Sequence, residues 1–147
     1  MRKRDTNKKI YHVYVLKHDR RIKMNREIHL PHTYKHFKGA KYITLFTATY
    51  IDKEEYNGQL FKGCMEAIHT EYRDNVSIVE KNGEYRYTYF DDQGELVIYV
   101  CTSGENIGRI YARPIKMFAS KVDEKKYPDV KQIYRFEKVG DKKREVK

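Results

Sequence analysis

Hydrophobic and polar residues alternate along several short runs that are rich in β-branched and aromatic side chains. Such alternation predicts strands with one buried face, whereas an apolar residue at every position predicts a central strand buried on both faces. Residues 96–100 are of the second kind. The predicted strands are residues 11–16, 42–51, 76–79, 85–90, 96–100, 109–113 and, as a closing strand, 133–136.

Turn-forming residues separate these runs at Asn57-Gly58, Asn82-Gly83 and Asp92-Gln93-Gly94. Asn82-Gly83 lies between two strand-like runs, as in a β-hairpin. Pro114 followed by residues 115–119 predicts one short helix, while residues 64–72 fit a helix or a strand. The pattern as a whole predicts a mainly β fold, a small antiparallel, SH3-like or partly open β-barrel with one short helix after Pro114.

Composition narrows the class of protein. A chain of 147 residues has the size of one domain, and its 14 tyrosines supply large rings for a modest core. No apolar run approaches the roughly 18 residues of a membrane span, and no apolar segment follows the charged N-terminus as in a secretion signal. Two cysteines, Cys64 and Cys101, cannot form a disulfide framework. We expect a cytoplasmic protein with reduced thiols and no membrane partner.

The net charge of +10 is concentrated near the N-terminus. Residues 1–40 hold 12 Lys or Arg against 3 Asp or Glu, whereas residues 41–122 hold 10 against 12. A basic segment attracts polyanions because phosphate contacts release counterions, so nucleic acid is one expected partner. The alternative is a solvated tail that keeps the domain in solution. The candidate polyanion contacts are Arg2, Lys3, Arg4, Lys35 and Lys38.

An ordered series of segments resembles the DUF1653 domain, a small bacterial and phage family without an established function. The series comprises residues 34–39 with Tyr42, residues 67–71, residues 97–99, residues 111–118 and residues 126–137. Its most specific parts are Arg113-Pro114-x-x-Met117-Phe118 and Tyr134-Arg135-Phe136-Glu137. The resemblance implies a β-barrel-like domain in a bacterium or a phage-infected host cell, favours a strand over residues 64–72, and implies no catalytic residues.

The resemblance also predicts how the chain is divided. Residues 1–33 form a basic N-terminal extension with one strand, residues 34–139 form the DUF1653-like β domain, and residues 140–147 form a charged tail. Extra material is expected near residues 52–63 and 75–94.

Motifs for catalysis are missing from the sequence. It has no phosphate-binding glycine loop followed by Lys-Ser/Thr and no Gly-x-Ser-x-Gly. Three histidines, His29, His32 and His36, have a spacing that could surround one metal ion, but Pro31 interrupts any helix that would align them. We therefore expect no catalytic residues, no metal and no cofactor.

Residues 103–113 are the most suggestive segment for binding. If residues 109–113 are extended, Arg109, Tyr111 and Arg113 project from one face. Arginine forks pair with phosphate and a tyrosine ring stacks on a base. In the structural alternative, Arg113 pairs with a carboxylate and Tyr111 belongs to the core. The candidate ligand-binding residues are Arg109, Tyr111, Arg113 and Asn106, extended by Arg86 and Phe90 from residues 85–90.

These patterns predict a non-catalytic binding module for a phosphate-bearing small molecule, such as a nucleotide or a cyclic nucleotide-type signal. Some phage-encoded Thoeris anti-defence proteins are similar in size and β content, which implies that the module sequesters an immune signal. One alternative is a nucleic-acid-binding module that uses the basic arm. The other is a homo-oligomeric interaction module, because Tyr85, Tyr87 and Tyr89 share one face that is either a core stripe or a protomer interface. We expect a homo-oligomer.

Overall fold

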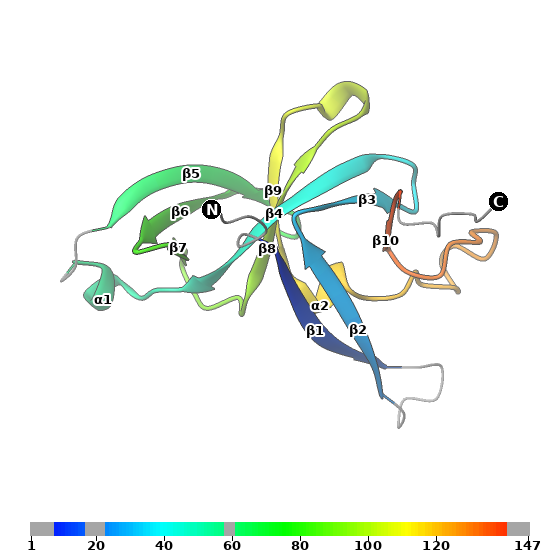
Figure 1. Cartoon of the computed structure of the whole chain (residues 1–147), viewed down its shortest axis with the longest axis horizontal. Helices are drawn as coiled ribbons and strands as arrows, with labels where there is room; N and C mark the ends of the chain where they lie inside the picture. The colour runs from blue at the N-terminus through cyan, green and yellow to red at the C-terminus, as the bar shows by residue number, and fades with distance from the viewer. Residues whose placement is uncertain (1–7, 17–22, 58–60, 141–147) are drawn as a thin grey trace, which may run out of the picture.

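The computed structural model describes residues 8–16, 23–57 and 61–140, which form a mainly β structure with two short helices and one 3-10 turn (Figure 1). In chain order the elements are β1 (Lys9–Leu16), β2 (Lys23–Leu30), β3 (His32–His36), β4 (Lys41–Tyr50), α1 (Lys53–Asn57), β5 (Lys62–His69), β6 (Asn75–Lys81), β7 (Glu84–Thr88), β8 (Leu96–Cys101), η1 (Gly104–Asn106), β9 (Ile110–Pro114), α2 (Ile115–Phe118) and β10 (Phe136–Lys138).

Eight strands form one sheet that closes on itself. Their order is β10-β3-β4-β7-β6-β5-β9-β8, and β8 also pairs with β4, so the six strands from β4 to β8 make a ring. Figure 1 shows β5, β6 and β7 on one side of β4 and β8, with β3 and β10 on the other. The mainly β prediction is confirmed. Most pairings are antiparallel, as expected, but β4–β7 and β5–β9 are parallel, and these two contacts complete the ring.

Two hydrophobic cores lie on opposite faces of the ring. The inner core contains Ala48, Ala67, Val76, Ile78, Tyr87, Leu96, Ile98 and Ala112. The outer core contains Val13, Val15, Ile28, Leu30, Tyr34, Val97, Tyr99, Phe118, Ala119 and Phe136. Strand β8 separates them, since Leu96 and Ile98 point inward while Val97 and Tyr99 point outward. This arrangement confirms that the all-apolar run is a central strand.

The hairpin of β1 and β2 is the main covering of the outer core. Where the sequence predicted one strand in residues 1–33, the structure has two, paired antiparallel along their whole length. Charged residues in Lys23–Leu30 hide the apolar alternation that Ile28 and Leu30 provide. Arg26 ties β2 to the end of the chain, since its Nη1 donates to the Ala119 carbonyl at 2.9 Å and its Nη2 donates to the Phe136 carbonyl.

Most of the turns and short elements predicted from local sequence patterns are present in the structure. Asn82 and Gly83 have φ of 54° and 82° and join β6 to β7, so the expected hairpin is present. It supplies two strands of the ring. Helix α2 follows Pro114 as expected, whereas α1 is an additional helix. The closing strand lies at Phe136–Lys138, later than predicted, and Tyr134 forms only an isolated bridge with Lys121.

Tyr87 is fully buried in the inner core, and Tyr85 and Tyr89 pack against it half-buried. The three same-face tyrosines therefore form a core stripe in this chain. Across the described residues, no helix is long and apolar enough to cross a membrane.

Candidate functional site

Strand β9 places Tyr111 and Arg113 side by side on its outer face. Ala112 between them points into the ring, as the alternation of a strand requires. The guanidinium of Arg113 is mostly buried, with 13% of the side chain exposed. Its Nε donates to the hydroxyl of Tyr99 at 3.0 Å, and its guanidinium carbon, Cζ, lies 5.4 Å from the ring centre of Phe136. Arg113 is thus held in a fixed position against aromatic rings.

Arg135 is brought to Arg113 by the C-terminal segment. Its backbone N–H donates to the Ser120 carbonyl at 2.9 Å, and its Nε lies 3.2 Å from the Ser120 hydroxyl. Burial lowers the pKa of Arg135, and the positive charge of Arg113 lowers it further, while Glu71 opposes both. The two guanidinium groups are therefore close enough to repel each other.

A single carboxylate faces this pair of arginines. Oε2 of Glu71 lies 3.8 Å from Nη1 of Arg113, which is an ion-pair distance but too long for a hydrogen bond. In the part of the chain that the structure describes, no hydrogen bond engages the Nη atoms of Arg113 or Arg135. Each guanidinium group therefore keeps Nη donors for which the described residues supply no hydrogen-bond acceptor.

Two further basic residues complete the site. Pairing of β10 with β3 sets His36 opposite Phe136, and the turn after β3 presents Lys38. Burial, followed by the charges of Arg113, Arg135 and Lys38, lowers the pKa of His36 from 6.5 to about 4. We call Arg113, Arg135, His36 and Lys38 the cationic cluster. Burial, together with the positive charges of the other three residues, keeps His36 neutral at physiological pH.

Half-buried aromatic rings flank the cationic cluster. The ring of Tyr42 lies 5.2 Å from that of Tyr99 and 6.1 Å from that of Tyr111, edge to face in both cases. Burial raises the pKa of Tyr42 to about 12, so its hydroxyl stays protonated. On the other side, Lys38 lies 5.5 Å from the ring centre of Tyr127. The cluster thus combines fixed positive charge with aromatic surface.

The perturbed histidine predicts an acid sensitivity. Between pH 6.5 and about 4, the unfolded chain binds a proton at His36 that the folded chain does not, so stability falls as the pH falls through this window. A shift of this size, reduced because His36 is half-buried, corresponds to about 1–2 kcal/mol. Urea unfolding at pH 7 and pH 4.5 measures it. We expect His36→Asn to lose less stability than the wild type across the window, and parallel losses would contradict the prediction.

The other sequence-predicted residues lie elsewhere. Arg109 and Asn106 are exposed in the connection from β8 to β9, where the Arg109 N–H donates to the Asn106 carbonyl. Phe90 is 68% exposed and contacts the ring of Tyr72, 5.9 Å away. Arg86 on β7 donates to the carbonyl of Tyr50 at 2.8 Å and lines a separate cleft. Of the six candidates, only Tyr111 and Arg113 adjoin the cationic cluster.

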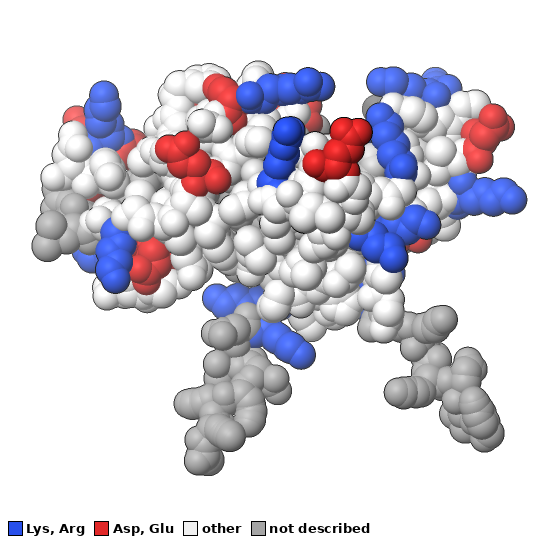
Figure 2. Space-filling view, turned by 90° about the horizontal axis from the view of Figure 1, so that it is seen from above, with Lys and Arg blue, Asp and Glu red and all other residues white. Residues whose placement is uncertain are grey.

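The candidate polyanion contacts are also separated. Arg2, Lys3 and Arg4 lie outside the described residues, Lys35 is exposed on β3, and Lys38 belongs to the cationic cluster. On the face seen in Figure 2, basic side chains are interspersed with acidic ones. A continuous basic surface is not visible on this face.

Sequence reasoning missed Arg135, His36 and Glu71 as neighbours of Arg113. All three lie inside the segments that resemble the DUF1653 domain, as do Tyr42, Tyr99 and Tyr111. Their shared place in these segments is the signal that could have identified them, whereas their gathering around Arg113 is visible only in the structure.

Comparison with known proteins confirms the family resemblance. The family described as "Protein of unknown function (DUF1653)" matches residues 81–138, which include Arg113 and Arg135. No curated protein and no solved structure matches the chain. The match starts inside the β6–β7 hairpin, so part of the expected extra material lies within the matched region.

Proposed function

Starting from a DUF1653 segment whose function is unknown, we propose that the protein is a non-catalytic binding module for a phosphate-bearing small molecule of the nucleotide or cyclic nucleotide type. The cationic cluster holds the phosphate. One observation supports this assignment above the others: among the described residues, the Nη atoms of two neighbouring guanidinium groups make no hydrogen bond, and the one carboxylate that faces them lies 3.8 Å from Nη1 of Arg113.

A phosphate group supplies the hydrogen-bond acceptors and the negative charge that this arrangement lacks. Its oxygens accept from two guanidinium forks at once, and its negative charge relieves the repulsion between Arg113 and Arg135. Glu71 is 41% exposed at its side chain, so it can turn toward solvent when an anion takes its place. Neutral His36 adds a hydrogen-bonding group without a further charge.

The aromatic rings beside the cluster suit the rest of such a ligand. Tyr111 and Tyr42 are half-buried, so each retains surface on which a base could stack. A base on Tyr111 with its phosphate on Arg113 matches the arrangement expected from the sequence of β9. The proposed role is sequestration of a cytoplasmic signal, and a phage protein that withholds an immune signal is its biological form.

The proposal is tested by calorimetric titration of purified protein with inorganic pyrophosphate, a mononucleotide, a cyclic dinucleotide and the matching nucleoside. We expect inorganic pyrophosphate, which has no base, to bind, and binding of at least one phosphate compound to persist at 0.3 M salt, because the site is formed before the ligand arrives. A failure of every phosphate compound, pyrophosphate included, would contradict the proposal. Binding of a single-stranded oligonucleotide alone, lost at high salt, would favour the nucleic-acid alternative.

A further inference from the structure

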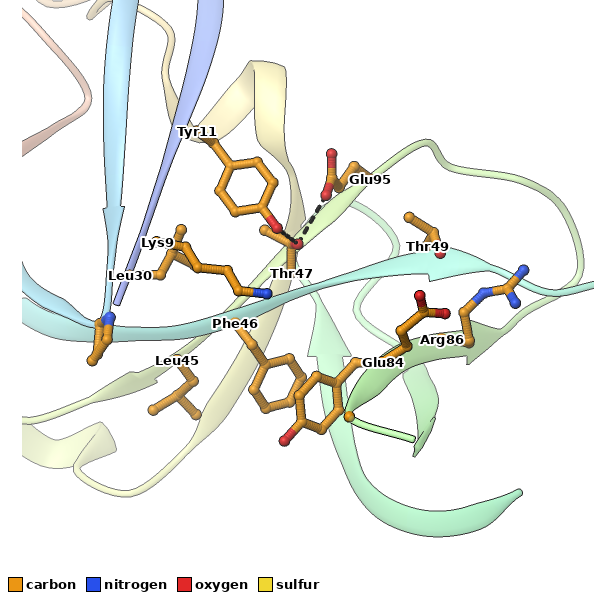
Figure 3. A pocket seen from close by; sticks show the side chains of 13 residues that line it. Lys9, Tyr11, Leu30, Leu45, Phe46, Thr47, Thr49, Glu84, Arg86 and Glu95 are labelled. Atoms are coloured by element: carbon orange, nitrogen blue, oxygen red, sulfur yellow. Dashed lines mark hydrogen bonds between the residues drawn. The ribbon is translucent and has the colours of Figure 1, made fainter. Parts of the chain in front are cut away.

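A separate cleft of about 600 Å³ lies between β1 and the part of the ring formed by β4 and β7 (Figure 3). Leu30 and Pro31 close it on the hairpin side, and Gly83 lies at its edge. None of the residues of the cationic cluster lines this cleft. Its chemistry therefore has to be considered independently of the proposed phosphate site.

A pair of stacked rings forms one wall of the cleft. Phe46 on β4 and Tyr85 on β7 have ring centres 3.8 Å apart and planes within 13° of parallel. Both residues are half-buried and both line the cleft. Because the rings cover each other's inner faces, a flat ligand would extend the stack on an outer face. The wall thus favours an aromatic ligand over an aliphatic one.

A fixed carboxylate lies on the opposite side. Oγ1 of Thr47 is 2.8 Å from Oε2 of Glu95 and 3.0 Å from the hydroxyl of Tyr11. The threonine hydroxyl has one proton, which it gives to the carboxylate, so Tyr11 donates to Thr47. This chain of bonds, drawn in Figure 3, orients Glu95. Its second oxygen accepts no hydrogen bond from any residue that the structure describes.

The charges in the cleft do not suit a phosphate. Two of the three nitrogens of the Arg86 guanidinium are engaged, because Nη2 donates to the Tyr50 carbonyl and Nη1 lies 3.4 Å from Glu55, and only its buried Nε lacks a partner among the described residues. The other charged residues that line the cleft are one lysine, Lys9, and two carboxylates, Glu84 and Glu95. In Figure 3 the Lys9 side chain extends into the cleft between the hairpin and β4. The cleft therefore offers an acceptor group and a donor group in addition to its aromatic wall.

We propose that this cleft binds a purine base of the guanine type. A planar base stacks on the Phe46–Tyr85 pair. The adjacent N1–H and N2 amino group of guanine donate to a carboxylate, for which Glu95 is placed, while its O6 and N7 accept from an ammonium group such as that of Lys9. Adenine lacks the N1–H and the N2 amino group and presents a donor in place of O6, so it satisfies fewer of these groups. The inference does not depend on the cationic cluster, and either site can exist without the other.

Titration of the wild-type protein with nucleosides tests the inference, because nucleosides carry no phosphate. Guanosine, inosine and adenosine are compared by the chemical-shift changes of the cleft residues in NMR spectra. We expect guanosine to bind about tenfold more tightly than adenosine, the effect of one charge-assisted hydrogen bond, with inosine between them. Equal affinity for the three nucleosides, or no binding of guanosine, would overturn the inference. Binding of arginine ethyl ester without binding of guanosine would overturn it as well, and would assign the cleft to a guanidinium side chain.

Variants locate the binding. Glu95→Gln keeps the size of the side chain and removes its charge, and we expect it to weaken guanosine binding about tenfold while pyrophosphate binding stays unchanged. Phe61→Ala is a control for a change elsewhere in the molecule, because Phe61 stacks on Tyr56 outside the cleft, and it should leave guanosine binding unchanged. Guanosine affinity that is unaffected by Glu95→Gln would overturn the site assignment. If the wild-type protein binds guanosine but not pyrophosphate, the guanine inference is supported and only the proposed phosphate site is contradicted.

Discussion

We expect Phe118→Ala to lower the free energy of unfolding by about 3–5 kcal/mol, the usual cost of removing a buried aromatic ring. Phe118 is fully buried at the centre of the outer core, and its ring stacks on that of Phe136 at 4.1 Å with planes 6° apart. Tyr34 and Tyr99 contact it edge to face at 5.3 and 5.2 Å. Alanine leaves a cavity that these rigid rings cannot fill without breaking contacts elsewhere.

Urea denaturation at pH 7 measures this loss, with Phe90→Ala as the matched control. Phe90 undergoes the same chemical change at a position that is 68% exposed, so we expect a change within about 0.5 kcal/mol. Domains of this size unfold with about 5–15 kcal/mol, so the Phe118 variant would lose a large part of its stability. Similar losses in the two variants would show that the outer core is not the principal source of stability.

The second large effect concerns the phosphate site. We expect Arg113→Lys to weaken binding of the phosphate ligand by about 10- to 100-fold, because lysine keeps the charge but cannot offer two parallel donors to one phosphate. Arg135→Lys should act in the same direction. Since the two guanidinium groups bind the same anion, the losses in the double variant should not add. Calorimetric titration with the ligand found for the wild type measures all three.

Arg109→Lys is the matched control for this series. It makes the same replacement at an exposed position in the connection between β8 and β9, and we expect the affinity to change less than about twofold. Thermal melting of each variant verifies folding, because Arg113→Lys also removes the hydrogen bond to Tyr99. A loss in Arg109→Lys equal to that in Arg113→Lys would shift the site toward residues 103–109, the wider site predicted from the sequence. Unchanged affinity in both cluster variants would contradict the assignment.

Much of the local structure could be predicted from the sequence because it depends on neighbours along the chain. The all-apolar residues 96–100 are buried on both faces, Asn82-Gly83 makes a hairpin turn, and Pro114 precedes a short helix. Strand β2 escaped prediction because Arg26, a charged residue, shares the core-side face with Ile28 and Leu30 and so interrupts the apolar alternation. Alternation is visible only where composition does not mask it.

Only the part of the candidate site that lies on strand β9 could be predicted from the sequence. The parity of β9 predicted that Tyr111 and Arg113 share a face, and the structure places them there. Nothing in that parity indicates Arg135, which belongs to a segment that folds back over the outer core and pairs with β3. Arg86 and Phe90 were predicted to extend the same surface, yet their contacts lie at Glu55 and at Tyr72.

By itself the sequence determined many of the strands, although not β2, and which of their residues face a core, because alternation and turn chemistry act over a few residues. Tertiary structure alone decided which strands pair in parallel to close the ring. It also decided that Arg113 meets Arg135 and that Lys9 and Glu95 face one cleft. The physical reason is that these contacts join residues far apart in the chain. Their partners are selected by how completely the whole fold buries its apolar surface, which no local pattern records.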